Sequence, residues 1–248
     1  MKGIILAGYS GEGLHPLTLG VPKQLLPIYN KPMIYYAIEA LVEVGIKDIL
    51  VITEPHHLSA FVNALSSSSQ FDANFTFATQ AAPEGIAQAL TIGESFIRNE
   101  GVCFMTGDCI ILGEERAKKI HKAIRASELS GQSTIFVSKD FYPTQYGVAK
   151  IDEKGKCMEI EGRAIDRSFY SITGLYVFPK GVSNFAKIIE KSERGRLEMV
   201  SLNQTYLEEN KLQVQVLGEG FKWLDTNSFD SLMKASRYIQ KQKDKQVK

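Results

Sequence analysis

The chain has 248 residues, of which 44% are hydrophobic and 23% are charged, the proportions of an ordinary globular protein. Its 29 basic and 28 acidic residues leave a formal net charge of +1, which argues against an electrostatic nucleic-acid binder. No apolar run approaches the ~18 residues of a membrane span, and the three cysteines show neither metal-site spacing nor the density of a disulfide scaffold. We therefore expect a cytoplasmic protein that binds neither membranes nor nucleic acid.

The first predicted element is a short apolar strand over residues 3–7, which runs into a loop that carries Gly8, Gly11 and Gly13. An apolar run that ends in glycines is typical of a buried parallel strand that delivers a loop to its carboxyl end. Glycine lets backbone N–H groups approach an anion closely. The loop is therefore a candidate phosphate-binding loop.

Apolar runs then alternate with segments of helical periodicity through the first half of the chain. The periodicity predicts helices over residues 33–44, 58–65 and 86–97, and strands over 48–52, 75–78 and 102–106. Alternating strands and helices indicate an α/β fold with a mostly parallel sheet flanked by helices. In such sheets, ligands bind at the carboxyl ends of the strands.

The second half of the chain has a more mixed pattern. Strands are predicted over residues 134–137, 147–151, 172–178 and 213–217, and helices over 182–190, 197–208 and from Asp230 onward. This half suits a lid or a sugar-binding subregion built on the same sheet. No linker, repeat or low-complexity segment interrupts the pattern, so residues 1–248 are expected to form a single domain with one mixed sheet.

A set of short motifs, in order along essentially the whole chain, carries a resemblance to a known family. The matching segments are Leu14 with Pro16–Thr18 (L-x-P-L-T), Lys23–Pro27 (KQLLP), Lys31–Tyr36 (KPMIYY), Gln80–Ala89 (QAAPEGIAQA), Gly107–Asp108 and Trp223–Thr226 (WLDT). The chain resembles the sugar-1-phosphate nucleotidyltransferases, most of all the glucose-1-phosphate thymidylyltransferases. The resemblance implies a Rossmann-like nucleotide-diphospho-sugar transferase fold. It also implies a reaction that joins dTTP to glucose 1-phosphate and releases pyrophosphate.

The resemblance also implies a role for particular side chains. Lys23 would contact the phosphates, and Asp108 and Asp225 would hold Mg²⁺, a hard cation that prefers carboxylate and phosphate oxygens. The implied nucleotide-binding residues are Leu6, Gly8, Gly11, Gln24, Gln80 and Gly85. The implied sugar-phosphate-binding residues are Tyr146, Gly147, Glu161, Gly174 and Arg194.

Two departures from the family pattern fall on the catalytic cations. The arginine of the first loop is replaced by Gly13, and the lysine of an E-K-P motif is replaced by Gly162. Transfer between phosphates depends on positioning and fixed positive charge, so losing two such groups is expected to cost ~10⁴ or more in rate. Three further family positions differ: Tyr9 and Glu12 stand where the family has glycine and threonine, and Cys109 stands where it has asparagine.

These departures leave two main hypotheses. In the first, the protein binds a nucleotide or sugar nucleotide with weak or absent catalysis, as a partner or regulator of an active paralogue. In the second, it is an active thymidylyltransferase with rearranged cations, for which Arg163 is the main candidate and Arg196 and His15 are weaker ones. A structural subunit without a ligand is disfavoured because the base- and sugar-reading positions still match the family. An oligomer is expected, either of this chain alone or with an active paralogue.

Overall fold

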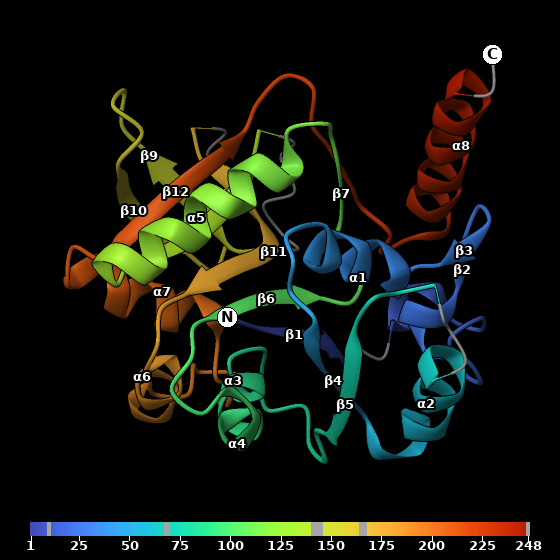
Figure 1. The fold of residues 1–248 in the computed structure, drawn as a ribbon, viewed down its shortest axis with the longest axis horizontal. Coiled ribbons are helices and arrows are strands. Elements are labelled where there is room, and N and C mark those ends of the chain that lie inside the picture. The colour runs from blue at the N-terminus through green and yellow to red at the C-terminus, as the bar shows by residue number, and fades with distance from the viewer. Residues whose placement is uncertain (9–10, 67–69, 140–145, 164–167, 247–248) are drawn as a thin grey trace.

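The computed structural model describes residues 1–8, 11–66, 70–139, 146–163 and 168–246, and nine strands of these segments form one mixed sheet (Figure 1). The main path of the sheet runs β10-β9-β11-β6-β1-β4-β5, with β8 beside β11 and β12 beside β8. The strands are β1 (Lys2–Ala7), β4 (Asp48–Thr53), β5 (Asn74–Thr79), β6 (Val102–Thr106), β8 (Ser133–Ser138), β9 (Val148–Ile151), β10 (Cys157–Glu161), β11 (Tyr170–Phe178) and β12 (Leu212–Leu217).

The parallel part of the sheet is formed by the first half of the chain. β1 lies between β4 and β6 and is parallel to both, and Ile5 is in register with Val51 and Met105. β5 extends the parallel part beside β4, whereas β11 is antiparallel to β6, β8 and β9. The chain continues from β1 to β4 on one side and returns to β6 on the other. The carboxyl end of β1 is therefore a switch point, where ligands of open α/β sheets bind.

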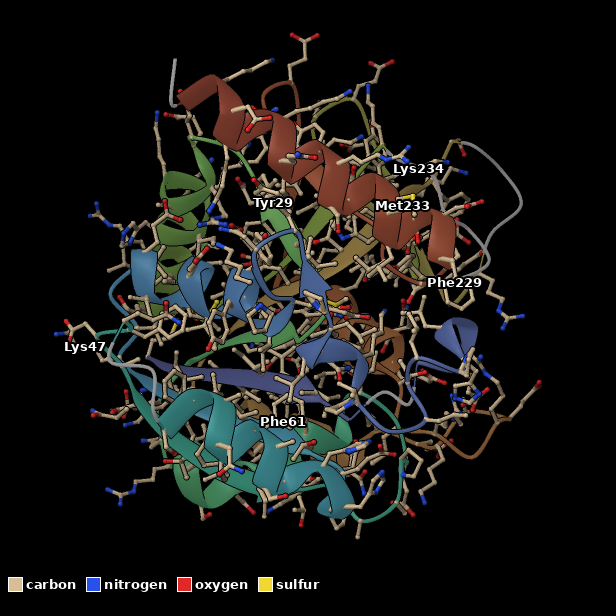
Figure 2. The ribbon with its side chains drawn as sticks, turned by 90° about the vertical axis from the view of Figure 1, so that its right-hand side faces the viewer. Tyr29, Lys47, Phe61, Phe229, Met233 and Lys234 are labelled. Carbon is tan, nitrogen blue, oxygen red and sulfur yellow. The ribbon has the colours of Figure 1, made fainter. Side chains whose placement is uncertain are left out.

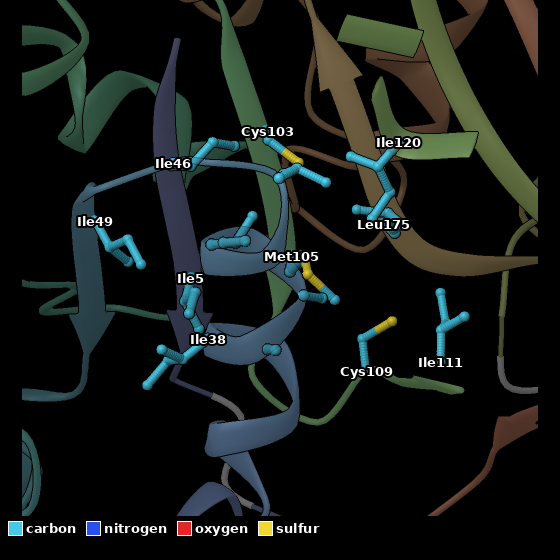
Figure 3. Packing of buried hydrophobic residues seen from close by; sticks show 14 of the residues in the cluster. Ile5, Ile38, Ile46, Ile49, Cys103, Met105, Cys109, Ile111, Ile120 and Leu175 are labelled. Atoms are coloured by element: carbon cyan, nitrogen blue, oxygen red, sulfur yellow. The ribbon is translucent and has the colours of Figure 1, made fainter. Parts of the chain in front are cut away.

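Helices cover both faces of the sheet because successive strand residues point to opposite faces. Ile5 and Met105 pack with one set of helices in a buried cluster that Figure 3 shows in part. Ile4 and Phe104 pack with the other set in a second cluster. The first cluster includes side chains of α1 (Ile34–Glu43), α2 (Leu58–Ser66) and α5 (Arg116–Ser130). The second includes side chains of α3 (Gln88–Ile92), α4 (Glu94–Ile97), α6 (Val182–Ile188) and α7 (Met199–Glu208).

The last helix, α8 (Phe229–Gln246), extends away from the sheet and covers a smaller buried cluster that includes Ile28, Met33 and Ile239 (Figure 1). Two short antiparallel strand pairs contribute side chains to the same cluster. They are β2 (Pro27–Ile28) with β3 (Lys31–Pro32), and β7 (Ile110–Leu112) with β13 (Lys222–Leu224). Figure 2 shows Tyr29 beside α8, where its backbone N–H donates to Ser236 Oγ at 3.2 Å.

Most predicted elements are present with small shifts in their bounds, and the mixed sheet flanked by helices is confirmed. The helix predicted over 86–97 is wrong as a single element, because it is divided into α3 and α4 at Gly93. A Cβ atom at Gly93 would lie 3.0 Å from Ile4 Cδ1, so the chain approaches the sheet closely there. The strand prediction over 102–106 matches β6 residue for residue.

Helix α5 is the largest element that the sequence pattern did not predict. Its exposed residues are mostly charged, so its average composition is that of a polar surface segment. The apolar face is formed by Ile120, Ala123 and Ile124, which are buried at helical spacing. Gly131 ends the helix in a left-handed conformation, with φ 64°, and its N–H donates to the Ser127 carbonyl. Among the described helices, none has both the length and the apolar character that crossing a bilayer requires.

Candidate active site

In the loop after β1, Gly11 packs closely against the side chain of Lys23. Gly11 has φ +69°, and a Cβ atom there would lie 2.9 Å from Lys23 Cβ. The Gly11 carbonyl accepts hydrogen bonds from the Leu14 N–H and from Thr18 Oγ1, both at 2.8 Å. Glycine is therefore required at residue 11 both for its backbone conformation and for this close approach. Tyr9, which was singled out from the sequence, lies outside the described residues.

Lys23 is fully buried and joins three distant parts of the chain. It begins a short 3-10 helix, Lys23–Leu25, and its Nζ donates to Asp108 Oδ2 and to Asn227 Oδ1, both at 2.6 Å. Asp108 follows β6, and Asn227 follows β13. Two of the expected site residues, Lys23 and Asp108, are thus in direct contact. Asn227 was not predicted, although it comes directly after the W-L-D-T motif.

Asp225 belongs to the same network of hydrogen bonds. Its Oδ1 accepts from the Tyr146 hydroxyl at 2.9 Å and from Asn227 Nδ2 at 2.8 Å. Asn227 Nδ2 also donates to the Tyr146 hydroxyl oxygen at 2.6 Å, and the Tyr146 ring packs edge-on against Trp223. Burial, together with the carboxylates of Asp108 and Asp225, raises the pKa of Tyr146 well above its usual range. The phenol therefore stays protonated and remains a donor to Asp225.

The carboxyl group of Asp108 is ionised because of its partners. Burial by itself raises the pKa, but the charge of Lys23 and the hydrogen bonds from Lys23 and Thr106 outweigh it, so the net pKa of Asp108 is lowered. The next residue, Cys109, faces the core, where its thiol donates to the Thr173 carbonyl (Figure 3). Burial raises the pKa of Cys109 well above its usual value, so this thiol is not a nucleophile.

Gln80 lies next to the first loop, with its amide held in one orientation. Its Nε2 donates to the Gly85 carbonyl at 3.1 Å and to Gln88 Oε1 at 2.6 Å, while Gln88 Nε2 donates to Glu84 Oε2. Gln80 Oε1 would be 3.0 Å from a Cβ atom on Gly8. Both hydrogen bonds that the Gln80 amide nitrogen donates therefore go to atoms of the protein. The amide oxygen is directed toward the Gly8 backbone.

Gly85 is held against the segment before α7. It has φ +111°, and a Cβ atom there would lie 2.3 Å from the Leu197 carbonyl oxygen. The Leu197 N–H donates to the Glu84 carbonyl at 2.6 Å, and the Ala87 N–H donates to the Leu197 carbonyl at 3.1 Å. This close contact with Leu197 requires glycine at residue 85. The two backbone hydrogen bonds also fix the loop that carries Gly85 and Gln88, the residues that accept from Gln80.

Gln24 and Leu6 both lie against Gly107, at the carboxyl ends of β1 and β6. The Gly107 N–H donates to the Leu6 carbonyl at 2.8 Å. A Cβ atom on Gly107 would lie 2.9 Å from Gln24 Cγ, so the buried Gln24 side chain packs directly on the residue before Asp108. Most of the expected nucleotide-binding residues thus lie around the carboxyl end of β1: Leu6, Gly8, Gly11, Gln24 and Gln80.

The expected sugar-phosphate residues are not all brought together. A Cβ atom on Gly147 would lie 3.6 Å from the Glu161 carbonyl oxygen, so these two residues are neighbours. Gly174, with φ +87°, packs against Thr106, which precedes Asp108 by two positions. Arg194 is more than half exposed and its guanidinium pairs with Glu198 at 3.3 Å. The structure therefore shows Arg194 in a surface ion pair within its own segment.

Gly13 and Gly162, the two positions where the family resemblance led us to expect a cation, have very different surroundings. At Gly13, a Cβ atom would lie only 2.5 Å from the backbone carbonyl oxygen of Asn227. At Gly162, a Cβ atom would have no neighbouring atom within 4 Å. Arg163 is exposed and forms no ion pair with the described residues. The structure thus excludes a side chain at residue 13 in this loop conformation and accepts one at residue 162.

The fold and the comparisons with known proteins place this chain among the nucleotidyltransferases. Residues 2–242 match the family model described as nucleotidyl transferase, and the chain belongs to that family. A glucose-1-phosphate thymidylyltransferase of Neisseria meningitidis is 43% identical over 241 residues, which cover 97% of this chain and 83% of that protein. One from Mycolicibacterium smegmatis is also 43% identical, over 96% of this chain and 82% of the relative. The protein is therefore a glucose-1-phosphate thymidylyltransferase-like nucleotidyltransferase.

Solved structures agree with this placement. A Bacillus anthracis protein assigned as a glucose-1-phosphate thymidylyltransferase, crystallised with sucrose, superposes with a TM-score of 0.86 at 33% identity, over 96% of this chain and 94% of that chain. A UDP-glucose pyrophosphorylase complexed with UDP-glucose has a TM-score of 0.84 at 19% identity, over 97% and 98% of the two chains. The second likeness shows the shared fold alone.

Proposed function

We propose that this protein binds a thymidine or uridine nucleotide, or the corresponding nucleotide sugar, with little or no pyrophosphorylase turnover. The observation that carries the proposal is the contact between Gly13 and Asn227. The family's loop cation is absent at residue 13, and the space for any side chain there is taken by a backbone carbonyl oxygen. The side chain that would carry the cation therefore has no room to start from residue 13 in this loop conformation.

The binding part of the proposal is supported by the groups that remain. Lys23 contacts Asp108 directly and is connected to Asp225 through Asn227, and Gln80 is held with its oxygen toward the first loop. Thymine and uracil carry an N–H donor at the ring position where adenine has an acceptor. An amide oxygen fixed beside Gly8 therefore favours thymine or uracil over adenine.

The carboxylates of Asp108 and Asp225 fit a magnesium ion by their chemistry. Both are hard oxygen donors, and Asp225 uses a single oxygen, Oδ1, for its two hydrogen bonds with described residues. When bound there, Mg²⁺ would offset the negative charge of the nucleotide phosphates. Tyr146 and Asn227 would orient Asp225 toward the ion, and Lys23 would keep Asp108 ionised.

The catalytic part of the proposal depends on charge. In the family reaction, a sugar-phosphate oxygen attacks the α-phosphorus of the triphosphate and pyrophosphate leaves, so negative charge develops on the transferred group. Removing one fixed donor for such charge typically costs ~10²–10³ in rate. Here two positions lack their cation, and Glu12 adds an exposed carboxylate to the same loop. Nucleotide affinity is therefore expected to survive better than turnover.

An active thymidylyltransferase is the second candidate, and the names of the relatives favour it. Arg163 is the residue that would support it, because it is exposed and follows the uncrowded Gly162. A partner or regulatory role beside an active paralogue belongs to the first candidate only.

Calorimetry with dTDP-glucose, run beside a pyrophosphate-release assay with dTTP and glucose 1-phosphate, separates these functions. Binding without turnover supports our proposal, and turnover at an ordinary enzyme rate supports the second candidate. Absence of both binding and turnover would contradict both.

A further inference from the structure

A group of three metal-binding side chains lies outside the network around Asp108. Glu54, His56 and His57 are the one cluster of three or more histidine, cysteine or acidic residues within the described chain whose potential ligand atoms all lie within 4.8 Å of one another. The cluster follows β4 directly. Neither the family motifs nor the proposed function uses any of these residues.

The distances within this cluster match the spacing of ligands around a metal better than they match hydrogen bonds. Glu54 Oε2 lies 3.6 Å from His56 Nε2 and 3.9 Å from His57 Nε2, both too long for a hydrogen bond. Ligands held 2.0–2.1 Å from a tetrahedral zinc ion are separated by about 3.3–3.5 Å. The two glutamate–imidazole separations therefore exceed those of a tetrahedral zinc site by only a few tenths of an ångström, and all three potential ligand atoms lie within 4.8 Å of one another.

The backbone holds the two rings on the same side. The residues form a short 3-10 helix, Pro55–His57, in which the proline fixes the first φ angle and the His57 N–H donates to the Glu54 carbonyl at 3.1 Å. The ring centroids of His56 and His57 are 3.9 Å apart although the residues are adjacent in the chain. Glu54 and His57 are largely buried, whereas His56 is 65% exposed, so an ion has access from the solvent.

We propose that Glu54, His56 and His57 bind a zinc-type transition metal ion through one carboxylate oxygen and two imidazole nitrogens. Imidazole ligands suit zinc, copper, nickel and iron, whereas magnesium prefers oxygen. The site is therefore chemically distinct from the carboxylates of Asp108 and Asp225. Three protein ligands leave a fourth position open for water or another oxygen ligand.

The site lies on the opposite side of β1 from Asp108. β4 and β6 flank β1, and the Glu54 N atom would be 3.9 Å from a Cβ atom on Gly8. The residue before Glu54, Thr53, donates from Oγ1 to the Ala7 carbonyl at 3.3 Å, and its own carbonyl accepts the Gln80 N–H at 2.8 Å. A bound ion would thus brace the turn that holds Gln80 beside the first loop.

The test is a titration of untagged, chelator-treated protein with Co²⁺, followed by displacement with Zn²⁺. We expect one equivalent of Co²⁺ per chain, with the intense visible absorption of a four-coordinate ion, and its loss when Zn²⁺ is added. His56→Ala and Glu54→Gln should each weaken Co²⁺ binding by about tenfold or more, as disturbed metal sites typically do.

The matched control is His121→Ala, because His121 is an exposed histidine on α5. This variant should bind Co²⁺ as the unmutated protein does, and circular dichroism of every variant confirms folding. Because no nucleotide is present, the result does not depend on the proposed function. The spectrum of a hydrated ion, or equal binding by the His56→Ala variant, would overturn the proposal.

Discussion

The carbonyl oxygen of Asn227 lies 2.5 Å from where a Cβ atom on Gly13 would stand, so this loop conformation admits only glycine at residue 13. The same Asn227 accepts from Lys23 through its side-chain oxygen. Asn227 thus limits residue 13 through its backbone and contacts the buried lysine through its side chain. No side chain can be placed at residue 13 unless the backbone around Asn227 moves.

Gly13→Ala should lower the free energy of unfolding by about 1–3 kcal/mol, because the added methyl group overlaps a backbone carbonyl. Gly13 does not have a positive φ, so strain of a left-handed backbone conformation does not add to the steric overlap. Urea unfolding at neutral pH measures it. Gly20→Ala is the matched control: Gly20 follows in the same loop region, and a Cβ atom there meets nothing within 4 Å. Equal stability of the two variants would contradict the close contact.

Lys23→Met should destabilise the protein by about 3–5 kcal/mol at pH 7, because it leaves the carboxylate of Asp108 buried without its partner. In the unmutated protein the pKa of Asp108 is lowered, so its contribution to stability is present above the unfolded value of ~3.9 and is lost as the pH falls through the folded pKa. In the variant, burial is opposed only by the hydrogen bonds from Thr106 and from the backbone, so the pKa of Asp108 should be higher than in the unmutated protein and acidification should cost the variant less stability. The difference in stability should therefore narrow between pH 7 and pH 4.

Lys47→Met serves as the control for this prediction, because Lys47 lies at the surface (Figure 2) and its ion pair with Asp72 is exposed. Its effect should stay within about 0.5 kcal/mol and should not change in the same way with pH. A stability difference for Lys23→Met that is independent of pH would show that the charge of Asp108 is not what Lys23 stabilises.

Mg²⁺ should strengthen nucleotide binding by about tenfold or more, which corresponds to about 1.4 kcal/mol. Asp225→Asn should abolish this gain, since an amide oxygen is a weaker ligand for a hard cation than a carboxylate. Calorimetry with dTTP, in Mg²⁺ and in a chelator, measures both. Asp72→Asn, an exposed carboxylate in a surface pair, should behave as the unmutated protein. Equal dTTP affinity with and without Mg²⁺ in the unmutated protein would count against the site.

Gln80→Leu should weaken dTTP binding by about 1–3 kcal/mol while leaving ATP binding unchanged, because only thymine loses a hydrogen-bond acceptor for its ring N–H. The unmutated protein should accordingly prefer dTTP and UTP to ATP. Competition against a fluorescent nucleotide gives the affinities, and Gln240→Leu on the exposed side of α8 is the control. Comparable affinity of the unmutated protein for dTTP and ATP would contradict the proposed role of Gln80 in selecting the base.

β1, β4 and β6 were predictable from the sequence because their residues are apolar over nearly their whole length, and β6 is buried at four of its five positions. β10, with the sequence CMEIE, was not predicted, because it alternates polar and apolar residues over a short length and two of its five residues are exposed. Helix α5 was not predicted because its buried face is formed by few residues between many charged ones.

The candidate site was likewise predictable only in part. The motif residues could be placed at strand ends, but Asn227 is 204 residues from Lys23, and only the folded chain shows that they touch. The contact at Gly13 depends on backbone position, which no residue pattern reveals.

The most direct test of the account is a steady-state assay of pyrophosphate release with dTTP, glucose 1-phosphate and Mg²⁺, run on protein whose binding of dTDP-glucose has been verified. We predict no more than a trace of turnover, on the order of 10³–10⁶-fold below a relative that has both cations. Turnover of ~1–10³ s⁻¹, the ordinary range for enzymes, would contradict the account and would make Arg163 the next residue to replace.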